Sequence, residues 1–522
     1  MMRLPIQNTF IDALTADIET SNEPRKVFDA VYSFVMPTVP KAPRVLHVNN
    51  DLANKIGIPI EAVESEAFLN VFSGKTIYPN TKPFAMCYGG HQFGVWAGQL
   101  GDGRAINLFE LETNQEKVTL QLKGAGKTPY SRSADGLAVL RSSVREYLCA
   151  EAMHHLGVPT TRSLSLITSG NEVLRDVMYN GNPAYEKGAI VCRVASSFIR
   201  FGNFEIFASR NDIKNLRALA DFTIKAYFPE IKSAGKKKYL DFFEQVMHSS
   251  RKMIVEWQRV GFVHGVMNTD NMSIHGITID YGPYGWLEDY NPNWTPNTTD
   301  ASQHRYAFGN QPQMALWNLY QLANALYPLI NETEDLEVLL QSYETLYEQD
   351  FIAMMRKKMG LLTAIESDQE LIYQLLHQLQ NIETDYTIFF RLLAQVQVTD
   401  APTEAIAKIN EAFYDTTLLK NKVLNNWETW FTNYLNRLQF ETSTQEQRMQ
   451  TMNQSNPKYV LRNYMAQLAI EKADAGDYSL IEQFFVVLQN PYEEQLEQQQ
   501  WFAKRPDWAR TKIGCSQLSC SS

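Results

Sequence analysis

The sequence predicts an α+β fold with two lobes, a strand-rich N-lobe followed by a helical C-lobe, with an N-terminal extension and a helical C-terminal extension. The first observation is the segment Lys117–Lys123, where Val118, Leu120 and Leu122 alternate with polar residues in the period of a half-buried strand. The second is that the chain after about residue 212 has the apolar spacing of helices. A chain of 522 residues is long enough for several units, which we place at 1–95, 96–210, 211–330 and 331–522.

The individual elements follow from local patterns. Strands are expected at Ala105–Glu112 and Lys117–Lys123, and residues 189–210 are again strand-like. A helix is expected from about Leu140 to Leu156, and an amphipathic helix over Lys236–Val260. Long helices follow from Gln311 to about residue 490. Residues 1–95 mix short apolar stretches with prolines, which indicates an extension wrapped on the core.

Composition narrows the class of protein. Hydrophobic residues make up 44% and charged residues 20% of the chain, as in ordinary globular enzymes. The net charge of -10 argues against nucleic acid as the main partner, and no long apolar run indicates a membrane span. The five cysteines include no C-x-x-C pair, and the N-terminus is unlike a signal peptide. We therefore expect a cytoplasmic protein that contacts neither nucleic acid nor membrane.

The strongest motif is His-Gly-Val-Met-Asn-Thr-Asp-Asn at 264–271, followed by Asp280-Tyr281-Gly282. It has the skeleton H-x-D-x-x-x-x-N of a kinase catalytic loop and then a metal-binding turn like D-F-G. Val266 stands where a kinase carries its catalytic Asp, and valine cannot accept a proton. Asp270 lies four residues later. The motif predicts a protein-kinase-like two-lobe fold in which the acid–base group has moved.

Two further features of the N-lobe fit a nucleotide site. Lys123 ends its strand as the phosphate-pairing lysine of kinases does, and Glu146 on the next helix is its candidate partner, with Glu151 as a rival. The turn Gly101-Asp102-Gly103-Arg104 lies one strand earlier, where glycines let backbone N–H groups approach phosphate. Each feature alone is weak evidence for a nucleotide site, because a plain hairpin turn can carry the same glycines and a surface lysine can follow an edge strand. Their order along the chain favours the nucleotide site.

The predicted metal ligands are Asn271 and Asp280, because amide and carboxylate oxygens suit Mg²⁺ or Mn²⁺ bound to a triphosphate. Asp270 is the candidate base for an attacking hydroxyl, with a structural carboxylate or a second metal ligand as alternatives. Arg193 and Arg200 bind either phosphate or protein carboxylates, which the sequence does not decide. His264 is expected to be a structural histidine.

Several long segments resemble the selenoprotein O family, which comprises kinase-fold protein adenylyltransferases. They are the residues 88–94 (Tyr-Gly-Gly-His-Gln-Phe-Gly), 99–104, 122–126, 131–136, 141–146, 193–202, 264–285, 305–312 and 456–463, together with the terminal Cys-Ser-Ser. The resemblance spans roughly residues 30–522 and its motifs are specific.

The resemblance implies that ATP binds inverted relative to kinases and that AMP passes to Ser, Thr or Tyr hydroxyls of protein substrates. It implies a metal dependence on Mg²⁺ or Mn²⁺, with Asp270 as the proton acceptor, Glu146 paired to Lys123, and Asn271 and Asp280 on the metal. It assigns nucleotide binding to Gly101, Gly103, Arg104, Lys123, Asp135, Gly136, Arg193, Arg200 and Asp280. Cys520 occupies the position of selenocysteine in some relatives and is a candidate redox thiol. UMP transfer from UTP with Mn²⁺, γ-phosphoryl transfer and an inactive nucleotide-sensing pseudokinase remain alternatives.

Overall fold

The structure is a computed structural model that describes residues 3–113 and 116–519. Within this part of the chain, nine strands form one antiparallel sheet in the order β2-β4-β7-β8-β11-β10-β3, with β1 paired to β7 and β9 paired to β11. Their bounds are β1 (Ile6–Gln7), β2 (Tyr32–Phe34), β3 (Arg44–Val48), β4 (Phe84–Met86), β7 (Ala105–Glu112), β8 (Lys117–Lys123), β9 (Ala138–Val139), β10 (Arg162–Arg175) and β11 (Ala184–Ala195). Two small two-stranded sheets lie outside this sheet: β5 (His91–Gln92) with β6 (Val95–Trp96), and β12 (Phe262–Val263) with β13 (Gly285–Trp286).

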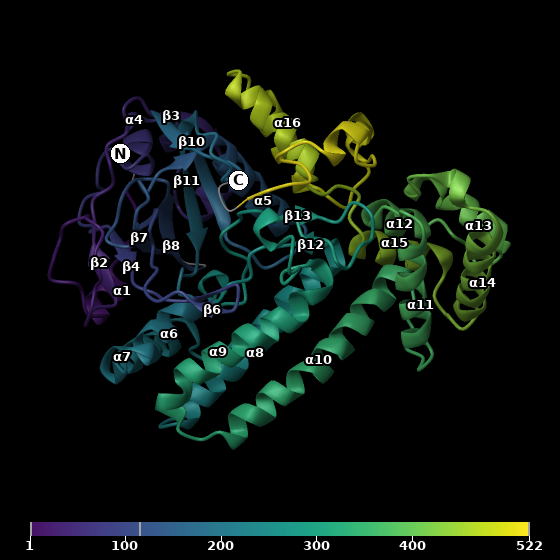
Figure 1. Cartoon of the computed structure of the whole chain (residues 1–522), viewed down its shortest axis with the longest axis horizontal. Coiled ribbons are helices and arrows are strands. Elements are labelled where there is room, and N and C mark those ends of the chain that lie inside the picture. The colour runs from purple at the N-terminus through teal and green to yellow at the C-terminus, as the bar shows by residue number, and fades with distance from the viewer. Residues whose placement is uncertain (1–2, 114–115, 520–522) are drawn as a thin grey trace.

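Helices follow the sheet and dominate the second half of the chain (Figure 1). The short N-terminal helices are α1 (Thr9–Ala13), α2 (Asn50–Lys55), α3 (Ile60–Val63) and α4 (Glu66–Phe72). The remainder are α5 (Leu140–His155), α6 (Phe201–Ser209), α7 (Ile213–Tyr227), α8 (Lys237–Val260), α9 (Gln311–Ile330), α10 (Glu334–Met359), α11 (Asp368–Asn381), α12 (Tyr386–Leu393), α13 (Pro402–Lys408), α14 (Asn421–Leu438), α15 (Gln445–Ser455), α16 (Asn463–Asp474) and α17 (Ser479–Gln489). No helix of the described residues is long and apolar enough to cross a membrane.

The predicted mixed α+β architecture, with a strand-rich part before a helical part, is confirmed. The expected strands at 105–112 and 117–123 and the expected helices near 140–156 and 236–260 are present. The strand-like reading of 189–210 is wrong at its end, where Phe201–Ser209 forms helix α6. Apolar side chains there are buried on every side of the helix, so the sequence shows no amphipathic period.

The segment before residue 96 contributes strands to both edges of the sheet. Strand β2 ends one edge and β3 ends the other, and β1 and β4 pair with β7. These strands have two to five residues each, and their positions depend on partners distant in the sequence. Residues 1–95 are therefore built into the sheet and do not only wrap around it.

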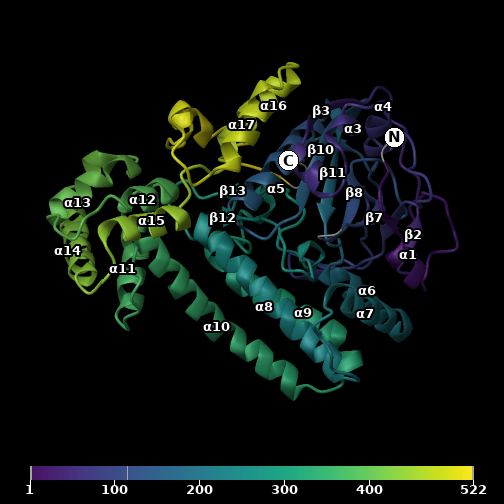
Figure 2. The ribbon, with the colours of Figure 1, turned by 180° about the vertical axis from the view of Figure 1, so that it is seen from behind.

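Two apolar cores hold the molecule together. The larger one joins the sheet to α5 and to helices α6–α9, and includes Leu120, Val144 and Trp257. The smaller one lies among α10–α15, with Trp427, Trp430 and Phe389 at its centre. Figure 2 shows the same arrangement from behind, with α11–α14 far from the sheet. The loops after β12, which carry the 264–285 motif, lie between the sheet and the long helices.

Candidate active site

The predicted site residues gather around one cavity of about 700 Å³ between the sheet and the 264–285 loops. Its lining includes Gly101, Gly103, Arg104, Lys123, Asp135, Gly136, Arg193, Arg200, Asp270, Asn271 and Asp280. Glu146 does not line the cavity and lies behind Lys123. Residues from four distant parts of the sequence thus meet at one place, with a size suited to a nucleotide.

Lys123 and Glu146 form the predicted ion pair. Lys123 is the last residue of β8, and its Nζ lies 2.5 Å from Oε2 of Glu146 on α5. Both side chains are buried. Burial lowers the pKa of Lys123, and the carboxylate of Glu146 opposes that shift. The rival Glu151 instead binds Arg162 and the backbone N–H of Ser163, which is a structural role.

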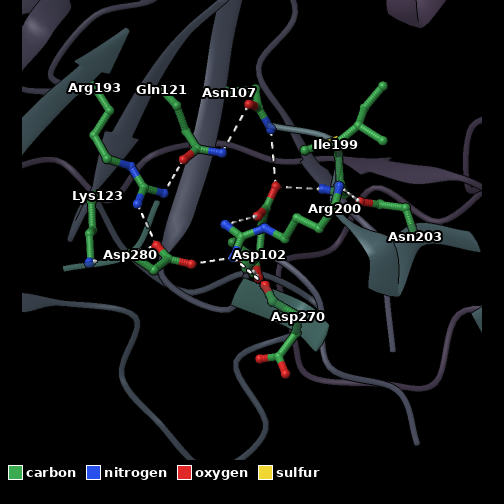
Figure 3. A network of polar contacts seen from close by, with 12 residues as sticks. Asp102, Asn107, Gln121, Lys123, Arg193, Ile199, Arg200, Asn203, Asp270 and Asp280 are labelled. Carbon is green, nitrogen blue, oxygen red and sulfur yellow. Dashed lines mark hydrogen bonds and ion pairs between the residues drawn. The ribbon is translucent and has the colours of Figure 1, made fainter. Parts of the chain in front are cut away.

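Asp280 is at the centre of a buried charge network (Figure 3). Its Oδ1 accepts a hydrogen bond of 2.5 Å from Arg193 Nη1, and its Oδ2 accepts one from Arg200 Nη1. Burial opposes its ionisation, but Arg200, Arg193 and Lys123 hold the pKa of Asp280 well below the usual range. Arg193 also contacts Glu146 at 3.1 Å and Gln121. In this structure both arginines therefore pair with protein carboxylates, although both still line the cavity.

Arg200 links Asp280 to the candidate base. Its Nη1 donates to the backbone oxygen of Asp270 at 2.7 Å, and its Nη2 lies 3.9 Å from Oδ1 of Asp102. Asp102 is buried and accepts from the backbone N–H of Met86 at 2.9 Å and from Asn107 at 3.1 Å. The guanidinium also lies 4.8 Å from the ring centre of Tyr88. Arg200 thus fixes the relative positions of Asp270, Asp280 and the glycine turn.

Asp270 has the environment of a proton acceptor. It lies in a short 3-10 helix, Thr269–Asn271, and its Oδ2 accepts from Gln92 Nε2 at 3.2 Å. Its Oδ1 is buried and has no hydrogen-bond partner among the described residues. Burial raises the pKa of Asp270 to about 7. A Cβ on Gly90 would lie 2.7 Å from Oδ1, so only glycine leaves room for this carboxylate.

Two other residues of the 264–271 loop make hydrogen bonds to nearby backbone. Asn271 donates its Nδ2 to the backbone oxygen of Val266 at 2.9 Å, which leaves the amide oxygen available as an acceptor or ligand. His264 is buried, and its Nε2 lies 2.9 Å from the backbone oxygen of Ile279. The expected structural role of His264 is confirmed.

The glycines of the 101–104 turn are needed for packing. Gly101 has φ +104°, and a Cβ there would lie 2.4 Å from Tyr130 Cγ. A Cβ on Gly103 would lie 2.8 Å from the backbone oxygen of Tyr130. Contact with Tyr130 is sufficient to explain both glycines, so their role toward phosphate stays a prediction.

Asp135 and the exposed arginines form the outer part of the cavity. Asp135 pairs with Arg175 of β10 at 2.7 Å, and Gly136 packs on the backbone of Gly126. Arg104 and Arg132 are exposed and have no ion pair among the described residues. Arg132 and Arg175 were not predicted as site residues, although both line the cavity. Nothing in the local sequence of β10 indicates that Arg175 reaches a turn 40 residues earlier.

Comparison of the sequence with known proteins identifies the family of this chain. A model of the family described as protein adenylyltransferase SelO matches residues 16–489. The chain belongs to the SelO family.

Relatives of the SelO family are similar over the full length. The chain is 62% identical to the protein nucleotidyltransferase YdiU of Flavobacterium johnsoniae, over 100% of both chains. It is 51% identical to the protein of the same name from Rhodopirellula baltica, over 99% of both, and 49% identical to that of Azoarcus, over 100% of both. The predicted family and the predicted enzyme class, a nucleotidyltransferase, are confirmed.

The thiols of this SelO-family chain are mostly structural. Cys87, Cys149, Cys192 and Cys515 are buried and unpaired. Burial raises the pKa of Cys515 to about 11, so this thiol is unreactive as it stands. Cys520, the candidate redox residue, lies outside the described residues.

Proposed function

We propose that this protein transfers AMP from ATP to hydroxyl side chains of protein substrates, with the α-phosphate directed at the acceptor. Membership of the SelO family and the names of the relatives support nucleotide transfer to protein. The observation that carries the proposal is the carboxylate of Asp270 in the same cavity as the Lys123–Glu146 pair and Asp280. The cavity has no carboxylate at the kinase position, where Val266 lines it instead.

Asp270 is suited to accept the proton of the incoming hydroxyl. A general base works best when its pKa lies near the working pH, and burial raises the pKa of Asp270 to about 7. Its unpartnered Oδ1 is the atom that would take the proton. Gln92 holds the other oxygen, which fixes the carboxylate in one orientation. The hydroxyl oxygen then attacks the α-phosphorus, and pyrophosphate leaves.

The cations of the cavity are suited to a triphosphate. Lys123, oriented by Glu146, presents an ammonium group at the inner end. Arg104 and Arg132 stand exposed at the outer end without internal partners among the described residues. Arg193 and Arg200 also line the cavity and carry guanidinium forks, which match phosphate oxygens. A bound triphosphate would compete with Asp280 for these two arginines.

We further propose that Mg²⁺ or Mn²⁺ serves as the cofactor. Asp280 and Asn271 would hold it, and these hard oxygen donors fit such an ion because Asn271 has its amide oxygen free. Two protein ligands are enough, since Mg²⁺ in nucleotide sites takes its other ligands from phosphates and water. When bound, the ion would neutralise charge on the phosphates. Asp280 would have to exchange arginine contacts for metal contacts.

The protein-kinase-like two-lobe fold belongs to the same proposal. The sheet with α5 would be the N-lobe, and α6–α9 with the 264–285 loops would be the C-lobe. The Lys123–Glu146 pair between a sheet strand and a helix supports this correspondence.

The test is incubation of the purified protein with a protein acceptor and ATP labelled at either the α- or the γ-phosphate. Retention of α-label, and of the mass of one AMP group in intact-mass spectrometry, is expected. Lys123→Ala is the matched control and should lose the label while remaining folded, as circular dichroism verifies. Parallel reactions with UTP and Mn²⁺ decide the base. Labelling from γ-labelled ATP alone would overturn the proposal, and labelling by none of the nucleotides would favour a pseudokinase.

A further inference from the structure

A groove of about 870 Å³ runs along the outer edge of the sheet, separate from the nucleotide cavity. It is lined by residues 45–51 of β3 and the start of α2, by residues 63–66 and Leu69 around α4, and by Glu482, Phe485, Val486 and Gln489 of α17. None of its lining residues lines the nucleotide cavity. Nothing in the proposed transfer reaction uses it.

The strand that forms one wall has an open edge. Strand β3 is the last strand of the sheet, and β10 is its strand partner in the described part of the chain. The backbone N–H of Asn49 donates to the backbone oxygen of Leu164 on β10 at 2.8 Å. Because successive residues of an antiparallel strand alternate in direction, the N–H and C=O of Val48 point away from β10. An edge of this kind is a template for another strand.

The floor and rim of the groove differ in chemistry. Apolar side chains form the floor, and Val45 and Val486 are 37% and 49% exposed there. The charged side chains of the lining are carboxylates, namely Asp51, Glu64, Glu66 and Glu482, and no Lys or Arg lines it. Glu482 contacts His47 at 2.7 Å, whereas Asp51, Glu64 and Glu66 have no ion pair among the described residues. The groove thus combines an open strand edge, an apolar floor and a negative rim.

We propose that this groove docks an extended, basic segment of a protein by strand addition to β3. The peptide backbone of the segment would pair with the free edge of β3, alternate side chains would fill the apolar floor, and Lys or Arg would face the carboxylates. That the docked protein is a substrate for modification rests on the proposed function. A remote docking groove would let one cavity modify acceptors whose hydroxyl regions differ in sequence.

Binding of a defined peptide tests the proposal without any nucleotide. The probe is a fluorescein-labelled peptide of alternating Lys and Val, measured by fluorescence anisotropy against the full chain. Binding that weakens with salt is expected. A peptide of alternating Glu and Val should not bind. A peptide of alternating Lys and Pro keeps the charge but lacks every second backbone donor, and should also fail.

Variants locate the binding. Glu64→Lys/Glu66→Lys should weaken binding by about tenfold or more through charge reversal on the rim. Glu337→Lys/Glu344→Lys makes the same change of net charge on exposed residues of α10, away from the groove, and should bind normally. Val48→Pro should also weaken binding, because it removes a donor from the free edge and leaves the pairing with β10 intact. Circular dichroism and thermal unfolding verify that each variant is folded.

Three outcomes would overturn the proposal. The first is absence of binding, and the second is an equal loss of binding in the α10 control. The third is a loss of binding in the charge variant while the Lys-Pro peptide and the Val48→Pro protein both bind fully. That result would mean charge attraction without strand addition. Self-association that the groove variants abolish would assign the groove to a second copy instead. The Lys123→Ala protein should bind the peptide normally. Failure of docking is thereby separated from failure of nucleotide transfer.

Discussion

Asp270 and Val266 decide between two uses of the same scaffold. Asp270→Ala should slow AMP transfer by roughly 10²–10⁴-fold, the usual effect of losing a general base. Binding of ATP should survive, because the carboxylate contacts Gln92 and none of the cations that would hold phosphate. Rates from intact-mass spectrometry and ATP titration by calorimetry measure the two effects separately. An Asp270→Ala protein with full transfer activity would remove Asp270 from the mechanism.

The converse substitution is Val266→Asp, which restores the carboxylate of an ordinary kinase loop. If ATP binds with its α-phosphate toward the acceptor, this carboxylate faces the wrong part of the nucleotide. The variant should therefore transfer no γ-phosphate, as measured with γ-labelled ATP. A variant that phosphorylates the acceptor would show that the nucleotide binds in the ordinary direction.

The pH dependence of transfer should follow Asp270. A carboxyl group accepts a proton only when ionised, and its pKa of about 7 means that activity rises as pH increases through that value. The hydrogen bond from Gln92 favours the charged form, so Gln92→Ala should move the midpoint to higher pH. Initial rates under saturating ATP measure the midpoint. A midpoint that stays the same in Gln92→Ala would show that another group titrates.

Arg193 and Arg200 should not tolerate lysine. Each guanidinium contacts Asp280, and Arg193 also spans Glu146 and Gln121, which a single ammonium group cannot do. Both Arg193→Lys and Arg200→Lys should lower ATP affinity and the unfolding temperature together. Calorimetry and thermal unfolding report the two changes. Unchanged ATP affinity in both variants would leave the arginines with a purely structural role.

At the scale of elements, the sequence predicted those whose pattern is local. Strand β8 alternates along its own length and helix α5 has a clear stop, so both were found where they are. Strand β10 was missed, as were the short strands β1–β4, whose partners lie elsewhere in the sequence: β1 and β4 pair with β7, β3 pairs with β10, and β2 pairs with β4. Helix α6 was misassigned because tertiary contacts bury it on every side. The order of the motifs along the chain predicted the residues around Lys123, Asp270 and Asp280. Arg175 reaches the outer part of the cavity through sheet pairing that no local pattern encodes.

Helix α6 also makes a close backbone contact with the 88–94 segment. The backbone N–H of Gly89 donates to the oxygen of Gly202 at 2.9 Å, and a Cβ on Gly202 would lie 2.1 Å from the oxygen of Gly89. Gly202→Ala should therefore destabilise the protein by about 1–3 kcal/mol, as measured by denaturant unfolding. Gly282→Ala is the control, since its Cβ would have no neighbour nearer than 4.0 Å. Equal stability of the two variants would mean that α6 shifts freely.

At the scale of the whole molecule, the C-terminal helices are tied to the active-site half by buried charges. Arg462, just before α16, pairs with Glu288 beside β13 and with Asp385, which caps α12, at 2.9 Å. All three side chains are buried. Further links come from the C-terminal segment, where Leu518 pairs with Asn297 and Ser519 contacts the backbone of Val177. Arg462 therefore connects the larger core, which includes residues of α16, to the start of α12 in the smaller core.

Arg462→Met should destabilise the protein by about 3–5 kcal/mol, because it leaves two carboxylates buried without a counter-charge. Burial already raises the pKa of Glu288 against the pull of Arg462, which marks how poorly the site solvates a lone charge. Arg510→Met is the matched control. Arg510 pairs with Glu383 at 2.6 Å, but both side chains are about one-third exposed, so its loss should cost about 1 kcal/mol or less. Denaturant unfolding followed by tryptophan fluorescence measures both variants, since Trp427 and Trp430 of the smaller core and Trp257 and Trp286 of the larger core all contribute to the signal. If the smaller core then unfolds first, Arg462→Met should unfold in two steps, with part of the tryptophan change preceding loss of ATP binding. A single transition with equal losses in both variants would contradict the role assigned to Arg462.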